Sequence, residues 1–539
     1  MGDRDVRPIG TIESRPCHLA RLIRYVCHTM GRRLSPDGCA RCSMGSHPWK
    51  VRCVLMSTHK FVTLYGHFYQ PPREDPFTGL VPREPGATPH ENFNEKITHE
   101  CYRPNADAGN FEHISFDLGP TLAAWLERYH PDVHQQIIAA DRRHLERFGV
   151  GNALAHAYNH TILPLASARD KYTQIRWGLV DFAHRFGHPA EGMWFAETAV
   201  DRETLDIAAQ CGVKYTVLAP WQAAEPVDPT EPYRVSLDDG RSIIVFFYNG
   251  PLSGGVSFDW DTTSNADTFA ASYLPHHLSR EKLARGEDQL ILVASDGELY
   301  GHHKPWRDRF LSHLIRMGAQ SFDFAVTTLG RYLRDHQPQR EVALRAPSAW
   351  SCSHGVGRWS SGCACTEGDS AWKPALRGAL DHLATQVNEI FERVGGETLR
   401  DPWAARDEYI ALHHHWLSAE EFWTRHGRGD EMPLSGVARR RAEKLLEAQY
   451  WGQAMYTSCG FFFEDLDRIE PRNDIAFARR VISLVYEATG RGLEPTFVQE
   501  LAASRSWRHG LTGADLYRQL PPLEPGRLPT PPTPAEPAA

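Results

Sequence analysis

Short apolar runs alternate with helix-like stretches between residue 60 and about residue 335. Several of the runs are apolar almost throughout, as expected for strands buried on both faces. The predicted strands cover residues 61–65, 153–158, 192–196, 214–218, 242–247, 289–294 and 324–327. Pro120 in the first turn of one intervening helix, and Asp201 and Gly212 at the ends of another, support the alternation. This order predicts a parallel sheet in an α/β fold, a distorted TIM-like barrel with its function at the carboxyl ends of the strands.

The pattern becomes helical after about residue 370. Apolar positions recur at helical spacing in residues 375–394, 407–425, 437–456 and 474–489. We therefore predict a barrel over residues 57–335, and a linker block with a mainly helical C-terminal domain over residues 336–519. Residues 520–539 are rich in proline and are expected to be disordered.

The first 56 residues differ from the rest, because they are rich in Arg and Cys and show little periodicity. We expect a disordered extension, or one that arises from an upstream start codon, with Met56 as the true first residue. The alternative is a small zinc module built on Cys39-x-x-Cys42, although a single CxxC pair is a weak signal.

Composition narrows the class of protein. The chain has 539 residues, 41% hydrophobic and 23% charged, which is normal for a globular protein of more than one domain. A net charge of -8 without a basic face argues against nucleic-acid binding. No apolar run is long enough to cross a membrane, and no signal peptide is visible. The odd number of cysteines, 11, then favours reduced thiols in the cytoplasm.

Two acidic blocks stand at the ends of predicted strands. Glu197 closes the block that begins at Glu191, and Asp296 and Glu298 lie about a hundred residues later. Glycosidic bond cleavage needs two carboxyls, one at the anomeric carbon and one at the leaving oxygen. Glu197, beside Trp194, is well placed as a nucleophile, and a surface ion pair is the alternative. Asp296 and Glu298 face the same side of an extended segment, so either can be the acid; we favour Asp296, which is nearer the strand.

Histidines and polar groups accompany these carboxyls. His67 and Gln70 follow the first predicted strand, and His302 and His303 follow the second acidic block. His156 and His160 have the HxxxH spacing that binds metals on a helix, but here a strand enters a loop. We expect all six of these residues to bind substrate. For His156 and His160, metal ligation and a structural role are the alternatives.

Four blocks in this order resemble glycoside hydrolase family 57. They are an HQP-type block, a histidine block ending in Ile-Leu-Pro, a Trp-x-x-Glu block and an Asp-x-Glu-x-x-Gly-His block. The resemblance implies a (β/α)7 barrel and retaining chemistry without a metal cofactor, with Glu197 as nucleophile and Asp296 as general acid/base. It also implies substrate contacts by His67, His156, His160, Trp194, Glu298 and His302. Tyr65 departs from the family pattern, since many members have a histidine there.

We therefore predict a retaining glycoside hydrolase or transglycosylase that acts on α-linked glucan. Its partner is an oligo- or polysaccharide, and no nucleic acid, membrane, cofactor or metal is expected. One alternative is a metal-dependent polysaccharide deacetylase using His156 and His160, although no Asp-Asp pair follows the first strand. The other is a glycan-binding protein without catalysis.

A further cysteine block lies between the predicted barrel and the helices. Cys352, His354, Cys363 and Cys365 form a CxH and a CxC pair, which is an unusual spacing for zinc. We predict a compact buried loop that completes a wall of the active site, with four zinc ligands as the alternative.

Overall fold

The computed structural model describes residues 40–44, 51–55, 59–428 and 435–520. Two antiparallel strands, β1 (Ala40–Met44) and β2 (Val51–Leu55), belong to a first unit, Met1–Thr58. These strands fall within the extension expected to be disordered. The other expectations for that extension, including the Cys39 zinc module, and those for residues 521–539, lie outside the described residues.

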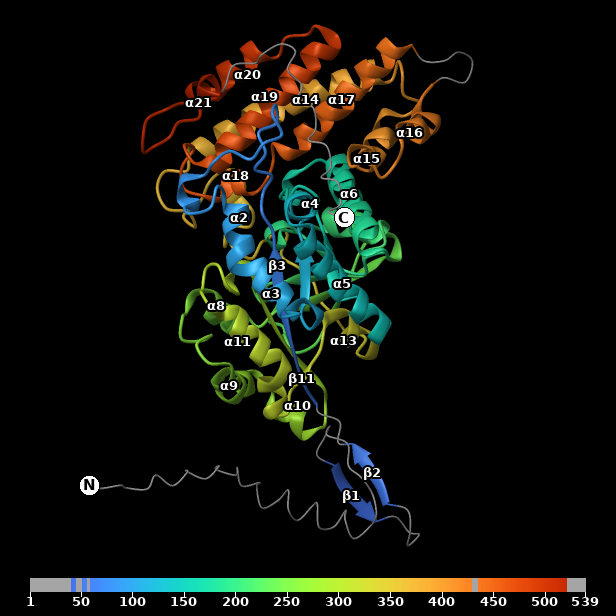
Figure 1. The fold of residues 1–539 in the computed structure, drawn as a ribbon, viewed down its shortest axis with the longest axis vertical. Helices are drawn as coiled ribbons and strands as arrows, with labels where there is room; N and C mark the ends of the chain where they lie inside the picture. Colours follow the sequence, from blue (N-terminus) through green and yellow to red (C-terminus); the bar gives the residue numbers. More distant parts are fainter. Residues whose placement is uncertain (1–39, 45–50, 56–58, 429–434, 521–539) are drawn as a thin grey trace, which may run out of the picture. The chain divides into compact units, whose positions relative to one another are not determined.

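The second unit, His59–Ala539, contains a parallel barrel. Its parallel strands pair in the order β10-β3-β4-β5-β6, and a parallel bridge between Gly192 and Tyr215 continues the sheet to β7 and then β9. The N–H of Asn249, just after β9, donates to the carbonyl of Leu292 in β10 at 2.8 Å and so closes the ring. This confirms the distorted (β/α)7 barrel (Figure 1). The strands are β3 (Lys60–Phe68), β4 (Ser115–Leu118), β5 (Ala153–His156), β6 (Met193–Trp194), β7 (Tyr215–Leu218), β9 (Ser242–Phe247) and β10 (Gln289–Asp296).

Three short strands modify the predicted pattern. β8 (Tyr233–Ser236) runs antiparallel to β9, and β12 (Arg340–Glu341) extends that edge. β11 (Ala325–Val326), predicted as residues 324–327, pairs among the described strands only with the start of β3. β4 was absent from the predicted strands, because its four residues include Asp117 and present no long apolar run.

Helices cover the outside of the barrel. α7 begins after Asp201, whose side chain accepts a hydrogen bond from the N–H of Thr204, as its N-cap signal predicts. The α-helices here are α2 (Phe93–Ile97), α3 (Arg103–Asp107), α4 (Pro120–Tyr129), α5 (Pro131–Phe148), α6 (Ala168–Phe186), α7 (Arg202–Gln210), α8 (Gly250–Phe258), α9 (Ala266–Thr268), α10 (Arg280–Ala284), α11 (Arg307–His313), α12 (Ala319–Ser321) and α13 (Leu329–Asp335).

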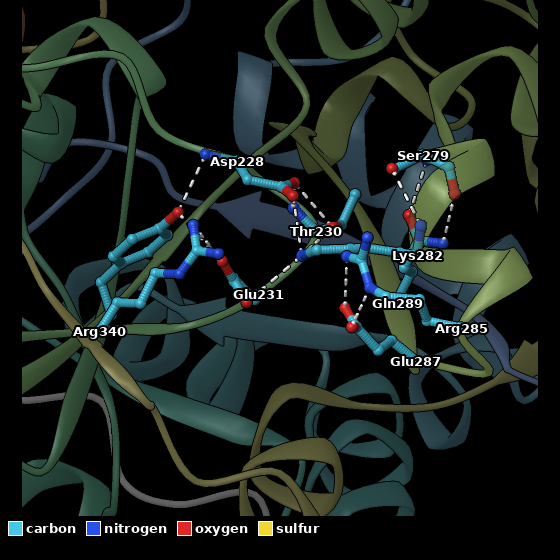
Figure 2. A network of polar contacts seen from close by, with 10 residues as sticks. Asp228, Thr230, Glu231, Ser279, Lys282, Arg285, Glu287, Gln289 and Arg340 are labelled. Atoms are coloured by element: carbon cyan, nitrogen blue, oxygen red, sulfur yellow. Dashed lines mark hydrogen bonds and ion pairs between the residues drawn. The ribbon is translucent and has the colours of Figure 1, made fainter.

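A polar network ties the amino end of β10 to its surroundings (Figure 2). The buried ammonium group of Lys282 in α10 pairs with Asp228 at 2.7 Å and with Glu231 at 3.3 Å. Gln289, the first residue of β10, accepts a hydrogen bond from the N–H of Ser279 at 2.7 Å. In barrels of this kind the amino end serves stability, so these charges hold the scaffold while the opposite end is left for chemistry.

The C-terminal region is helical, and α14, α17 and α19 run together within it (Figure 1). The helix predicted over residues 407–425 is two helices, because His415 has a φ of 59° and interrupts the chain between them. The bounds are α14 (Trp372–Ile390), α15 (Pro402–His413), α16 (Ala419–His426), α17 (Gly436–Ala454), α18 (Cys459–Phe462), α19 (Ile469–Thr489), α20 (Glu494–Leu501) and α21 (Gly513–Gln519). Within the described part of the chain, no helix is both long and apolar enough to cross a membrane.

These helices pack directly on one side of the barrel. Tyr158 and Trp177 of the barrel share a buried apolar cluster with the helical region. The indole N–H of Trp177 donates to the carbonyl of Arg406 at 3.0 Å, and the N–H of Ser458 donates to the carbonyl of His160 at 3.0 Å. The helical region therefore reaches the histidine block at the carboxyl end of β5.

Candidate active site

Candidate functional side chains form a row across the carboxyl ends of neighbouring strands. The strand register places Asp296 of β10 beside His67 of β3, and His67 beside Asp117 of β4. On the next pair of strands, His156 of β5 lies beside Trp194 of β6. Because parallel strands end at the same edge of the barrel, residues far apart in sequence meet there.

Glu197 is presented by a tight turn just after β6. Its backbone is left-handed (φ 58°, ψ 23°) within the short 3-10 helix Ala196–Thr198. Its carboxylate oxygen Oε2 accepts hydrogen bonds from the indole N–H of Trp350 at 2.8 Å and from the hydroxyl of Ser351 at 2.7 Å. The N–H of Trp350 also donates to the carbonyl of Glu197 at 3.1 Å, so the segment after the barrel fixes both backbone and side chain.

Asp296, the last residue of β10, is exposed to solvent. Although water reaches its carboxyl, the surrounding protein displaces much of its hydration and raises the pKa to about 6. The positive charge of His67 opposes this rise, and the nearby negative charges of Glu197 and Asp117 add to it. Asp296 is thus within electrostatic range of Glu197 and holds a proton near neutral pH more readily than an ordinary aspartate.

Glu298 is buried beneath Asp296 and is held by protein donors. Its Oε1 accepts a hydrogen bond from the hydroxyl of Tyr102 at 2.6 Å and one from the N–H of Tyr69 at 3.3 Å. Burial raises its pKa to about 7, against the effect of the Tyr102 hydrogen bond. Of the two carboxyls that the sequence left open as the acid, Asp296 is the one that solvent reaches.

A chain of hydrogen bonds crosses the floor of the site. Asp117 is fully buried and accepts hydrogen bonds from the Tyr65 hydroxyl at 2.7 Å and from His67 Nδ1 at 2.9 Å. Burial alone lowers the pKa of His67, but the charge and hydrogen bond of Asp117 outweigh it and raise the pKa to about 9. His67 Nε2 lies 3.2 Å from Nε2 of His160, whose Nδ1 lies 2.5 Å from the Ser458 hydroxyl. His67 is therefore cationic, and it donates to a neutral His160.

Trp194 and His156 are fully buried behind this chain. Trp194 stacks on Tyr65 and His67 with centroid distances of 4.8 and 5.0 Å, so it supports these rings instead of facing solvent. Burial lowers the pKa of His156 to about 4, so its ring is neutral. Both ring nitrogens of His156 and the hydroxyl of Tyr69 have no hydrogen-bond partner among the described residues.

Three of the predicted substrate contacts have partners of their own. Gln70 Oε1 accepts a hydrogen bond from Arg73 at 2.8 Å. His302 Nδ1 lies 2.5 Å from a carboxylate oxygen of Glu100. His303 is exposed and its ring contacts that of His302. The predicted role of these residues in substrate binding stays a prediction.

Candidate nitrogen ligands of His67, His156 and His160 lie within 4.8 Å of one another. This spacing suits a metal ion, but the hydrogen bonds of the cluster occupy the lone pairs that a metal needs. A protonated His67 has none, and the Nε2 lone pair of His160 accepts the proton of His67. In this arrangement only His156 is a ready ligand.

The sequence did not single out three groups that shape the site. Asp117 orders the histidines. In the sequence it is one isolated aspartate in a short segment before Gly119, with no motif around it. Trp350 and Ser351 hold Glu197, and their block was recognised only as a possible wall. Trp221 is 46% exposed, and its indole N–H donates to the carbonyl of Ala349 at 3.2 Å, beside Trp350.

The fold and this edge of acidic residues define a (β/α)7 barrel with paired carboxyls at the carboxyl ends of its strands. Within that class the chain belongs to glycosyl hydrolase family 57, whose family model matches residues 55–345. A second model, for a domain of unknown function (DUF3536), matches residues 369–522.

Individual relatives are distant. Alpha-amylase 1 of Dictyoglomus thermophilum is 23% identical over 221 residues, a match that covers 38% of this chain and 30% of that protein. The chain therefore corresponds to less than a third of the length of that curated relative. Among solved structures, an exo-type maltose-forming amylase from Pyrococcus sp. ST04 has a TM-score of 0.63 at 14% identity, covering 82% of this chain and 83% of its own. A branching enzyme from Thermococcus kodakaraensis has a TM-score of 0.54 at 15% identity, covering 88% and 100%. At these identities the structures share the fold.

Proposed function

We propose that this protein is a retaining glycoside hydrolase or transglycosylase that acts on α-linked glucan, with Glu197 as nucleophile and Asp296 as general acid/base. The observation that carries the proposal is the unequal environment of the two carboxyls. Glu197 is fixed by two donors, whereas Asp296 is exposed and has a pKa raised to about 6. One oriented carboxylate and one carboxyl that keeps its proton are the pair that glycosidic cleavage with retention requires.

The hydrogen bonds of Glu197 indicate which of its oxygens reacts. Both donors, Trp350 and Ser351, bind Oε2, so Oε1 is the oxygen directed at the anomeric carbon. Asp296 gives its proton to the leaving glycosidic oxygen as Glu197 forms the glycosyl ester. Asp296 then takes a proton from water, or from the hydroxyl of an acceptor sugar, and that oxygen attacks the anomeric carbon from the face opposite Glu197. The Glu197 carboxylate leaves, and the original anomeric configuration is restored.

A polar group in the site and exposed aromatic residues of the barrel unit suit a carbohydrate. The hydroxyl of Tyr69 is buried and has no hydrogen-bond partner among the described residues, so it is available to a sugar hydroxyl. Phe258, Trp260 and Trp306 are 89%, 55% and 67% exposed, and they follow β9 and β10. Exposed aromatic faces of this kind support stacking against the rings of a long chain.

Product analysis tests the proposal. Wild-type protein is incubated with amylose, glycogen and maltooligosaccharides, and the anomeric form of the first product is followed by proton NMR. Shorter or rearranged chains with retained α configuration are expected from the wild type, and none from Glu197→Gln. The matched control is Glu191→Gln, since Glu191 lies on the surface in an ion pair with Lys214 at 2.6 Å and should be dispensable. Inverted products, or full activity of Glu197→Gln, would exclude this mechanism.

The histidine cluster keeps the deacetylase alternative testable. The deacetylase alternative requires a divalent metal ion. The candidate ligand atoms of the three histidines lie within 4.8 Å of one another, a spacing that one ion could bridge. Activity on an N-acetylated glycan that is lost on chelation and restored by added metal would favour the deacetylase. Unchanged activity on α-glucan after dialysis against a weak chelator favours the glycosidase.

We also propose a cytoplasmic setting, which the free thiols of the described cysteines support.

A further inference from the structure

Four potential metal ligands converge in the segment between the barrel and α14. The ligand atoms of Cys352, His354, Cys363 and Cys365 all lie within 4.8 Å of one another. Sγ of Cys352 is 3.6 Å from Sγ of Cys363, and Sγ of Cys365 is 3.4 Å from Nδ1 of His354. A tetrahedral zinc ion with bonds of about 2.3 Å to sulfur and about 2.0 Å to nitrogen separates two sulfur ligands by about 3.8 Å, and sulfur from nitrogen by about 3.5 Å. The two measured separations match these values closely.

The shape of the segment brings the CxH pair back to the CxC pair. Gly355 and Gly362 both have left-handed backbones, with φ values of 72° and 78°. A side chain at Gly355 would meet the carbonyl of Pro347 at 2.8 Å, so glycine is needed for this turn. Between the glycines, the fully buried Trp359 anchors the segment. Apart from one short 3-10 turn, residues 351–371 form no helix or strand, and a segment of this length gains order from a cross-link.

Buried positive charge surrounds the thiols. Lys373 is fully buried within electrostatic range of Cys352 and Cys363, and Arg358 is 9% exposed and donates to the carbonyl of Cys365. Neither cation has a carboxylate partner among the described residues, and Arg358 Nε has no hydrogen bond there. Three thiolates with one zinc ion carry a net negative charge. Such a centre places negative charge beside the buried cations, in addition to the more distant Glu464 that acts on Lys373.

We propose that Cys352, His354, Cys363 and Cys365 bind one zinc ion, and that this ion fixes the segment whose Trp350 and Ser351 hold Glu197. Sulfur and imidazole ligands in tetrahedral array select zinc among common divalent ions, and four protein ligands leave no open position for substrate. The ion is therefore structural, and Trp350 and Ser351 are positioning residues. Metal binding stands independently of the proposed function, while the effect on Glu197 rests on it. The proposal departs from the expectation, drawn from the sequence, of a protein without metal.

Metal analysis of the full chain tests the site. The protein is produced in zinc-supplemented medium, purified without a tag or chelator, and analysed by inductively coupled plasma mass spectrometry. The expected result is one zinc per chain, lost to background in Cys363→Ser and Cys365→Ser and kept in Cys211→Ser, a cysteine at the end of α7. His156→Ala should also keep its zinc, which separates this site from the histidine cluster. Wild-type protein without zinc, iron in place of zinc, or zinc that survives both serine variants would overturn the proposal.

Two further measurements use the wild-type protein, so that loss of zinc through unfolding of a variant does not decide the result. Cobalt exchanged into folded wild-type protein should give the visible bands of tetrahedral thiolate coordination. Alkylation under denaturing conditions, before reduction, should modify Cys352 and Cys363. A disulfide between them, seen as protection from alkylation, would contradict the zinc site.

The positioning role has its own readout. His354→Cys offers four thiolates and should keep both zinc and activity, whereas His354→Ala should lose zinc. In His354→Ala, kcat on α-glucan should fall with KM nearly unchanged, because Glu197 loses its orientation while substrate contacts remain. Equal kcat in a folded, zinc-free His354→Ala would refute the positioning role. Zinc bound by a protein inactive on every α-glucan would leave the site intact and reject the proposed function instead.

Discussion

Replacing His67 with glutamine should make Asp296 a weaker acid. His67 is cationic because Asp117 raises its pKa to about 9, and its charge opposes the raised pKa of Asp296. Without that charge, Asp296 should keep its proton to higher pH. Since the general acid must be protonated in the free enzyme, activity falls as pH rises through the pKa of Asp296. The high-pH limb of kcat/KM should therefore move upward in His67→Gln.

The strand register sets the size of this shift. His67 and Asp296 are paired on adjacent strands, which lie about 4.8 Å apart. We work the shift for a charge separation of about 6 Å, slightly more than this spacing. Two unit charges at about 6 Å interact by about 2.8 kcal/mol at an effective dielectric constant of about 20, or about two pKa units. Solvent at the exposed Asp296 screens the interaction, which reduces the expected shift to about one unit.

The assay is the pH dependence of kcat/KM on a maltooligosaccharide. The midpoint of the high-pH limb should lie near 6 for the wild type, as for Asp296, and about one unit higher for His67→Gln. Tyr65→Phe is the control, because it removes a hydrogen bond to Asp117 without changing any charge. A limb in His67→Gln that stays in place or moves to lower pH would refute the assignment of Asp296 as the acid or of His67 as a cation.

Four substitutions, one of them a control, test the scaffold by thermal or denaturant unfolding. Gly178→Ala should lower the free energy of unfolding by about 3 kcal/mol and reduce activity, because its Cβ would lie 1.9 Å from the carbonyl oxygen of His156. Gly254→Ala is the control: its Cβ would meet nothing within 4 Å, so the change should be neutral or stabilising. Equal effects of the two variants would refute the steric argument. Asp474→Asn should stabilise the protein at pH 8 but not at pH 4: burial raises the pKa of Asp474, so its ionisation costs stability as pH rises, and a loss of stability at pH 8 would contradict this. Lys282→Met should cost about 2 kcal/mol, since it leaves two partly solvated carboxylates without their cation, and no loss would show that Figure 2 depicts a network of little energetic weight.

Strands with long apolar runs could be predicted from the sequence, and β9 has its predicted bounds, Ser242–Phe247. β4 could not be predicted, because its four residues include an aspartate and are too few to show a strand-like hydrophobic pattern. That same aspartate, Asp117, orders the histidines of the site. The interruption at His415 depends on one backbone angle that the surrounding helical pattern hides.

The candidate carboxyls were visible because they close apolar strands, whereas their partners were not. Trp350 and Ser351 lie 153 and 154 residues from Glu197, so only the closed barrel brings them together. Burial of Trp194 likewise follows from packing between Tyr65 and His67. A tryptophan beside a carboxylate looks the same in sequence whether it faces a sugar or the interior.

The left-handed turn at Glu197 has a consequence for how the chain can change over time. Glu197 and Thr198 both have positive φ values, 58° and 49°, a conformation that costs a residue with a side chain about 1–2 kcal/mol and is rarer still for a β-branched residue such as threonine. Glycine at either position would relax the turn. If the carboxylate had no role, mutations that replace Glu197 would therefore stabilise the protein and accumulate during evolution. A barrel that only binds glycans, without catalysis, would not need two consecutive residues in this strained conformation. A more stable Glu197→Gly variant would show that the protein keeps the carboxylate at this position at a cost in stability.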